Sequence, residues 1–153
     1  MRKFLILLAA GGLALAWAQA PPLPVLGQTF TPTPAQAARA AQLQATARAL
    51  AAAGAHVAAL LDERGNQVHV YTDRAGKVFG LAWQGVSMPD LRTMLGAYFA
   101  AFQQAAARPH RRGPLQVSVN GLVVDLGGHP RALRGRAYLK PALPGGLTPA
   151  VVQ

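Results

Sequence analysis

The sequence predicts a small α+β protein, in which antiparallel β-meanders alternate with helices in the order α-βββ-α-βββ. An Ala-rich stretch of high helix propensity precedes the first half of the strands, and a stretch with apolar residues at helical spacing precedes the second half. Apolar residues alternate with other residues at a period of two in the stretches that follow. Turn dipeptides separate these alternating stretches at hairpin intervals. The length of 153 residues suits a single domain, and we expect its helices to lie on one face of the sheet.

The first residues predict a segment for export and not a part of the folded domain. Met1-Arg2-Lys3 is a short basic segment, and the apolar run Phe4–Trp17 follows it. This layout is typical of a secretory signal peptide, and the run is shorter than the roughly 20 residues that a membrane-spanning helix needs. Cleavage after Ala18 is favoured over cleavage after Ala20, because Pro21 would then stand at the scissile bond. We therefore expect a periplasmic or secreted protein that starts at Gln19 and has no transmembrane anchor after cleavage.

The remaining chain divides by composition. Residues 1–18 are the predicted signal peptide, residues 19–33 a Pro-rich leader that we expect to be extended and mobile, residues 34–140 the α+β domain, and residues 141–153 an irregular Pro- and Gly-rich tail. Thr33 is a predicted N-cap with Pro34 at the first helical position. The Ala-rich helix that follows should extend to Ala53 and stop at Gly54. Few large apolar residues lie on it, which predicts weak docking.

The first meander starts near His56. A strand around residues 56–63 is followed by a turn at residues 64–66 and then by a predicted hairpin. Pairing Thr72 with Lys77 sets Val70 opposite Phe79 and Val68 opposite Leu81. One face of this hairpin would then be consistently apolar.

The second helix is predicted from a capping pattern. Ser87 is the expected cap, with Asp90 at the third helical position. The apolar residues behind it recur every three or four positions, which indicates one amphipathic helix that ends near Ala107. Phe99 lies off this apolar face and indicates a second packed face or an exposed contact.

The second meander carries the strongest local pattern. Asn120-Gly121 is the preferred type I′ turn dipeptide, and it sets Val119 opposite Leu122 and Val117 opposite Val124. Residues 127–130 are the next predicted turn, and residues 131–139 the last strand.

The order and spacing of six short motifs are similar to those of one known family. The motifs are Val78-Phe79 to Ala82-Trp83-Gln84-Gly85, Pro89-Asp90-Leu91, Leu95-Gly96-Ala97-Tyr98-Phe99, Gly113-Pro114-Leu115, Gly127-Gly128-His129-Pro130-Arg131-Ala132 and Gly135-Arg136-Ala137-Tyr138. Together they resemble the family of exported Gram-negative bacterial proteins known as domain of unknown function 2844, over His56–Leu147. The Ala-rich segment 35–53 is least like that family. The resemblance implies export and a shared fold, and the family has no established activity to carry over.

Composition excludes several classes of function. The chain has no cysteine, which rules out disulfides, thiolate zinc sites and a cysteine nucleophile. Its four histidines have no paired ligand spacing, and no Gly-rich phosphate loop opens a helix, so we expect neither a metal nor a cofactor. Fifteen basic against five acidic residues give a net charge of +10. An anionic envelope component or an acidic protein is the expected partner, because an exported protein seldom meets nucleic acid.

A basic stripe is the main candidate binding site. If Leu133 and Ala137 face inward, then Arg134, Arg136, Tyr138 and Lys140 share the outward face of the last strand. The complete candidate set adds the preceding loop and turn: Arg108, Arg111, Arg112, His129, Arg131, Arg134, Arg136 and Lys140. The alternative without a binding role is a solvated face that keeps the protein soluble and protects an edge strand from pairing.

His129 is the only catalytic candidate. It stands between two glycines and a proline, in what would be a stiff and accessible turn. There it could act as an acid/base, contact a partner or simply form part of the turn. Asp125 or Ser118 could assist it, but Ser118 lies in mid-strand, without the strained turn of a nucleophile. The residues therefore favour a non-enzymatic binding or accessory module of the cell envelope. The alternatives are an enzyme of unrecognised type centred on His129 and a structural protein that associates with itself through a sheet edge.

Overall fold

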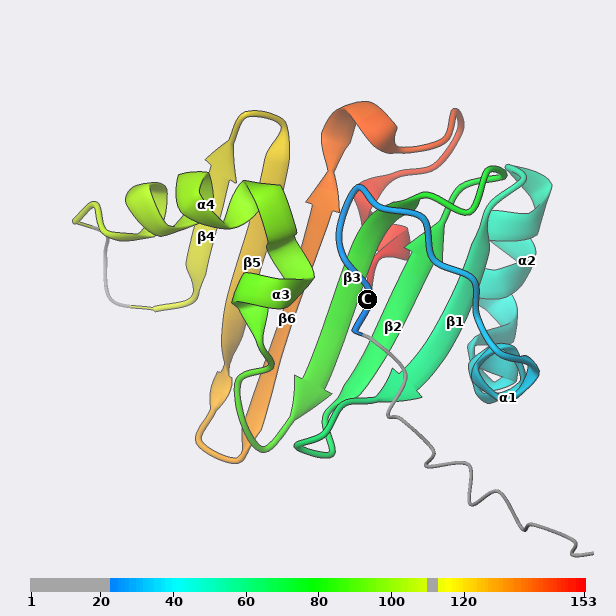
Figure 1. The fold of residues 1–153 in the computed structure, drawn as a ribbon, viewed down its shortest axis with the longest axis horizontal. Helices are drawn as coiled ribbons and strands as arrows, with labels where there is room; N and C mark the ends of the chain where they lie inside the picture. Colours follow the sequence, from blue (N-terminus) through cyan, green and yellow to red (C-terminus); the bar gives the residue numbers. More distant parts are fainter. Residues whose placement is uncertain (1–22, 110–112) are drawn as a thin grey trace, which may run out of the picture.

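Two three-stranded meanders join edge to edge into one antiparallel sheet, as the computed structural model shows for residues 23–109 and 113–153 (Figure 1). The strand order is β1-β2-β3-β6-β5-β4, so β3 and β6 pair in the middle. The predicted fold class and the order α-βββ-α-βββ are confirmed. The strands are β1 (His56–Leu61), β2 (Gln67–Thr72), β3 (Val78–Gly85), β4 (Leu115–Val119), β5 (Leu122–His129) and β6 (Ala132–Leu139).

The helical segments are short and lie on both faces of this sheet, not on one as expected. They are α1 (Pro34–Arg39), η1 (Ala40–Leu43), α2 (Gln44–Ala52), α3 (Leu91–Leu95), η2 (Gly96–Tyr98), α4 (Phe99–Ala106), η3 (Lys140–Ala142) and η4 (Pro149–Val151). In Figure 1, α3 and α4 lie in front of the sheet. We call this side the front face, and the opposite side, where residues 149–153 lie, the tail face. None of the helices in the described ranges is both long and apolar enough to cross a membrane.

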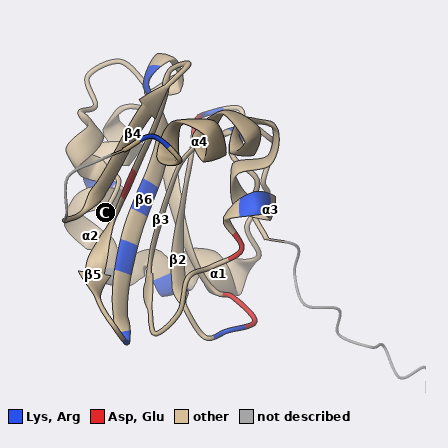
Figure 2. Ribbon diagram, turned by 90° about the vertical axis from the view of Figure 1, so that its left-hand side faces the viewer, with Lys and Arg blue, Asp and Glu red and all other residues tan. Residues whose placement is uncertain are grey.

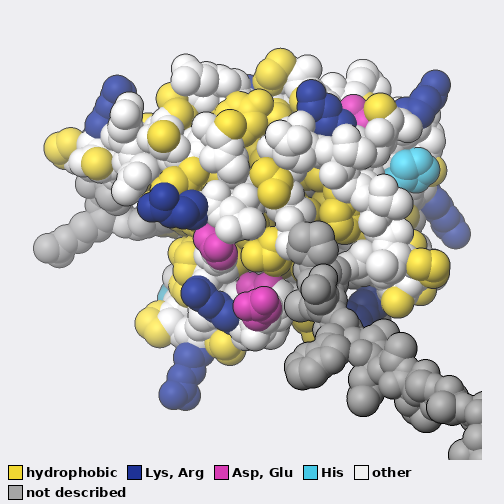
Figure 3. Space-filling model, in the orientation of Figure 1, with side chains coloured by type: hydrophobic (Ala, Val, Ile, Leu, Met, Phe, Trp, Pro, Cys, Tyr) yellow, Lys and Arg dark blue, Asp and Glu magenta, His cyan; other side chains and the backbone are white. Residues whose placement is uncertain are grey.

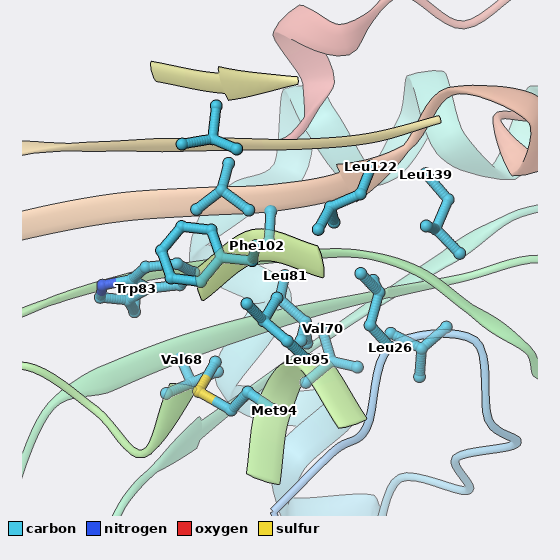
Figure 4. Close-up of a cluster of buried hydrophobic side chains, with 14 of the residues drawn as sticks. Leu26, Val68, Val70, Leu81, Trp83, Met94, Leu95, Phe102, Leu122 and Leu139 are labelled. Atoms are coloured by element: carbon cyan, nitrogen blue, oxygen red, sulfur yellow. The ribbon is translucent and has the colours of Figure 1, made fainter. Parts of the chain in front are cut away.

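The front face carries the larger core (Figure 4). Val68, Val70, Leu81 and Trp83 contribute the alternate side chains of β2 and β3, and Met94 of α3 packs onto them. The second core, on the tail face, contains Leu50 of α2, Tyr71 and Val152. Both faces of the sheet are therefore buried in part, which explains why β3 carries an almost continuous run of buried residues.

The second meander has the predicted register. Val119 pairs with Leu122 and Val117 with Val124, and Asn120 and Gly121 have the positive φ angles, 49° and 79°, of a type I′ turn. The next predicted turn, residues 127–130, is wrong. β5 continues to His129, and the turn consists of Pro130 and Arg131, in which Arg131 has a φ of 67°.

The predicted register of the first hairpin is also wrong. Val70 pairs with Leu81 and Val68 with Trp83, and a bulge shifts the ladder, so that Tyr71 pairs with Gly80 but Thr72 with Val78. The extra residue turns Phe79 to the tail face, where its ring centroid lies 6.3 Å from that of Tyr71. A bulge places two residues opposite one, so simple alternation could not give this pairing.

Residues 23–33 of the Pro-rich leader, which was expected to be mobile, cross the front face instead. Leu26 is 2% exposed and belongs to the larger core. The Leu26 amide donates to the Met94 carbonyl at 2.8 Å, and the Phe30 amide donates to the Gly76 carbonyl at 2.9 Å. Proline content alone indicated a mobile segment, whereas the apolar residues between the prolines bind it to the core. The predicted signal peptide, residues 1–18, lies outside the described residues.

The first helical stretch starts as predicted. The Thr33 side chain accepts a hydrogen bond from the Gln36 amide, and the Gln36 side chain accepts one from the Thr33 amide. The stretch stops at Gly54, whose φ is 70°, but a short 3-10 segment, η1, interrupts it.

The second helical stretch differs from the prediction in its cap and its continuity. The N-cap of α3 is Asp90, not Ser87; Ser87 instead contacts the buried Asn66 side chain. The stretch breaks at Gly96, whose φ is 50°. A Cβ there would stand 2.6 Å from Val25 of the leader, so this glycine gives the leader room to pass. Phe99 packs on the front core, and the Arg92 guanidinium carbon lies 5.0 Å from its ring centroid.

The Asp90 cap should make stability depend on pH. Hydrogen bonds from the Thr93 hydroxyl (2.6 Å) and the Thr93 amide (3.2 Å) lower the pKa of the Asp90 carboxyl. A lowered pKa stabilises the fold above the pKa of the unfolded chain, and this contribution disappears as the pH falls through the folded value. We expect Asp90→Ala to lower the free energy of unfolding by about 1 kcal/mol at neutral pH and by less in acid. Urea unfolding measures both. The Asp90→Asn control should lose little at neutral pH, because it still caps; an equal loss would contradict the assignment.

Candidate functional site

A groove of about 420 Å³ crosses the tail face beside the C-terminal segment. Gln67 and His69 of β2, Gln84 of β3, Arg134 and Arg136 of β6, and Asp125 of β5 line it, and Val152 and Gln153 contribute from the C-terminal segment. Such a volume is in the range of small-molecule and short-peptide sites. The groove depends on the central β3–β6 pairing, because this pairing brings residues of the two meanders together.

Arg136 is held in place at this groove by an ion pair. Its Nε donates to Asp125 Oδ2 at 2.7 Å, and the two residues are direct partners across β5 and β6. Its Nη1 donates to the Pro149 carbonyl (3.3 Å) and to the Val152 carbonyl (3.4 Å). The guanidinium carbon also lies 5.7 Å from the Tyr138 ring centroid. Arg136 therefore binds the C-terminal segment to the sheet, and most of its donors are used.

Arg134 is different, because its guanidinium is exposed and has no hydrogen bond or ion pair within the described part of the chain. Gln84 is its direct partner on β3 and Gly127 its partner on β5. Gln84 Nε2 in turn donates to Gln67 Oε1 at 3.1 Å. A free guanidinium beside two amides offers several donors to a ligand that carries a carboxylate or a phosphate.

His69 and Tyr71 hold the end of the C-terminal segment. The Tyr71 hydroxyl donates to the Gln153 main-chain oxygen at 2.6 Å, and His69 Nδ1 lies 2.9 Å from the same oxygen. Burial raises the pKa of the Tyr71 hydroxyl, partly offset by its hydrogen bond to Gln153. Since the oxygen can only accept, His69 Nδ1 is the donor in this contact.

Two acceptors beside the groove have no partner in the described structure. They are His69 Nε2 and Asp125 Oδ1, both buried. A buried polar atom without a hydrogen bond costs about 1–3 kcal/mol. Both atoms have almost no solvent-accessible surface, so they belong to the wall of the groove and do not contact a ligand in it.

Only part of the predicted basic stripe lies together on an exposed face. Figure 2 shows basic positions in succession along β6. Arg134 and Arg136 lie on this strand, and both line the groove. Tyr138 does not share an exposed face with them, because it is 6% exposed and belongs to the tail-face core. Lys140 has left the strand and begins η3. β6 pairs on both sides, so its charges do not protect an edge strand.

The other described members of the candidate set are not among the residues that line the groove. Arg131 is exposed in the turn after β5, and His129 is exposed at the end of that strand. Arg108 follows α4, whereas Arg111 and Arg112 lie outside the described residues. On the front face in Figure 3, the Lys and Arg side chains are dispersed and form no single patch.

The catalytic alternative finds no support in this geometry. Asp125 bonds to Arg136, and no hydrogen bond in the described ranges joins it to Ser118 or His129. Within the same ranges, no three residues of the His, Cys, Asp and Glu types gather as a metal site.

The sequence-based search missed the residues that build the groove around Arg134. Gln67, His69 and Tyr71 alternate with the core residues Val68 and Val70, so their shared face was visible in the sequence. Nothing local indicated that this face meets β6 or the C-terminal segment.

Comparisons with known proteins give one result. The model of the family described as "Protein of unknown function (DUF2844)" matches residues 24–152. No curated protein and no solved structure matches. The matched region includes the leader from Pro24 and the C-terminal segment to Val152, both of which are packed on the sheet.

Proposed function

We propose that this chain, which belongs to the DUF2844 family, is an exported, non-enzymatic binding module that holds an anionic partner in the tail-face groove. The observation that carries the proposal is the free guanidinium of Arg134 in a groove of about 420 Å³. Arg136 already has partners, so Arg134 supplies the charge that a ligand can pair with. A planar guanidinium with free donors favours carboxylate or phosphate groups.

Export is the second part of this proposal, and the N-terminal sequence supports it. A basic start followed by a short apolar run and small residues is typical of a signal peptide. In the periplasm or outside the cell, the partner would be an anionic envelope component or an acidic protein. The lack of cysteine is compatible with such a compartment, because stability then comes from the two cores.

Binding to three anionic probes at low and high salt tests this function. The chain from Gln19, which contains every described residue, is offered polyglutamate, a polyuronate and vesicles of anionic lipid. We expect at least one of them to bind at low salt and to dissociate at high salt, because screening weakens charge pairing. Arg134→Gln should weaken that binding about tenfold or more, the equivalent of one charge-assisted hydrogen bond.

Arg48→Gln is the matched control, since it removes the same charge from an exposed position on α2. It should bind like the unmodified protein. Binding to none of the probes, or equal losses in the two variants, would contradict a function that depends on the groove.

A further inference from the structure

We propose that the anionic partner is an acidic peptide segment, which lies extended across the strands beside residues 149–153. The inference rests on the proposed function, because it names the ligand class of the same groove. Three features carry it: the way in which the chain's own C-terminal segment is bound, the course of the groove, and the free donor and acceptor of the Gln67 and Gln84 amides.

The C-terminal segment shows how this sheet face binds an extended chain. It is bound through main-chain oxygens and not through its own side-chain charges. Arg136 donates to the carbonyls of Pro149 and Val152, and the Tyr71 hydroxyl and His69 Nδ1 contact the Gln153 oxygen. Val152 is fully buried. A Cβ at Gly80 would lie 2.9 Å from Val152 Cγ2, so this glycine leaves room for the segment.

The groove crosses the same strands next to that segment. Val152 and Gln153 form one side of it. Its floor continues from Gln67 on β2 to Gln84 on β3 and Arg134 on β6. A second extended segment would therefore lie alongside the first, with amide side chains beneath its main chain. Arg134 would pair with an Asp or Glu carboxylate, to which its fork of donors is complementary.

The two amides favour a peptide over the other anionic partners. Their mutual hydrogen bond leaves Gln84 Oε1 as an acceptor and Gln67 Nε2 as a donor, and a peptide main chain offers both N–H donors and carbonyl acceptors. A phosphate-bearing surface offers acceptors and leaves the Gln84 amide oxygen without a donor. An acidic saccharide also has donors, but the groove gives it no exposed aromatic ring. Its one aromatic lining residue besides His69, Trp83, is 3% exposed and packs against Gly135.

Peptide titrations by isothermal calorimetry test the inference with the chain from Gln19, which contains every residue that lines the groove. The probes are a short peptide of alternating Glu and Thr and its Gln-for-Glu analogue. We expect the Glu peptide to bind and the analogue to bind at least about tenfold more weakly. Arg134→Gln should remove this preference. Arg134→Lys should keep only part of it, since lysine has the charge but not the planar pair of N–H donors of a guanidinium. Arg48→Gln should leave it unchanged.

Each other result overturns the inference. If neither peptide binds, but a polyuronate or anionic vesicles bind through Arg134, the ligand class is wrong while the proposed function stands. If both peptides bind equally, or if Arg48→Gln loses as much affinity as Arg134→Gln, this groove does not recognise the carboxylate. If no probe of any class binds, the inference and the proposed function both fail.

Discussion

Replacing Leu26 with alanine is expected to lower the free energy of unfolding by about 2–5 kcal/mol, the usual cost of truncating a buried leucine. Leu26 is 2% exposed and packs in the front core with Met94 and Leu95. If the Pro-rich leader were mobile, Leu26 would be exposed to solvent, and its truncation would not lower the free energy of unfolding by this amount. Urea unfolding of the chain from Gln19 measures the difference, and the denaturant slope should stay the same, because the unfolded chain exposes similar surface.

Leu61→Ala is the control for this experiment, because it removes the same atoms from a side chain that is 56% exposed at the end of β1. We expect it to change the free energy of unfolding by about 0.5 kcal/mol or less. Equal effects of the two substitutions would show that the leader does not contribute to the core.

Local patterns determined which parts of the fold could be predicted. The β4–β5 hairpin was predicted with its register, because a two-residue Asn-Gly turn and strict alternation leave one solution. The β2–β3 hairpin was not, because a bulge beside Thr72 changes which residues face each core. The packing of the leader and of the C-terminal segment on the sheet was not predicted, for a different reason. Each makes its contacts with residues far away in the sequence, as between Tyr71 and Gln153.

The same distinction applies to the candidate site. Arg134 and Arg136 were found by their period of two on one strand. Tyr138 follows the same period, yet it is buried, because the tail-face core covers that end of β6. Gln84 and Gln67 join the site only through the pairing of β3 with β6 and β2. Residues on a strand can thus be assigned to a face from sequence, but what covers that face depends on long-range pairing.

Replacing each of the two adjacent glycines before His129 should have very different effects on the free energy of unfolding. Gly128 has a φ of 106°, and a Cβ there would lie 2.2 Å from the Ala132 main-chain oxygen. Backbone atoms of a paired strand cannot move aside easily, so strain and overlap add. We expect Gly128→Ala to lower the free energy of unfolding by about 2–6 kcal/mol. A loss below about 1 kcal/mol would contradict the β5–β6 geometry.

Gly127→Ala is the matched control and also informs on the groove. A Cβ at Gly127 would meet only Pro114, at an ordinary 3.7 Å, and alanine is favoured over glycine in a strand by about 0.5–1 kcal/mol. We expect its stability in urea to be equal or slightly higher. Gly127 is also the strand partner of Arg134 and lines the groove. If Gly127→Ala folds normally but binds the Glu peptide more weakly, this glycine keeps the groove open beside Arg134, whereas Gly128 allows the close pairing of β5 with β6. Unchanged binding would place the peptide away from β5, over Gln67 and Gln84.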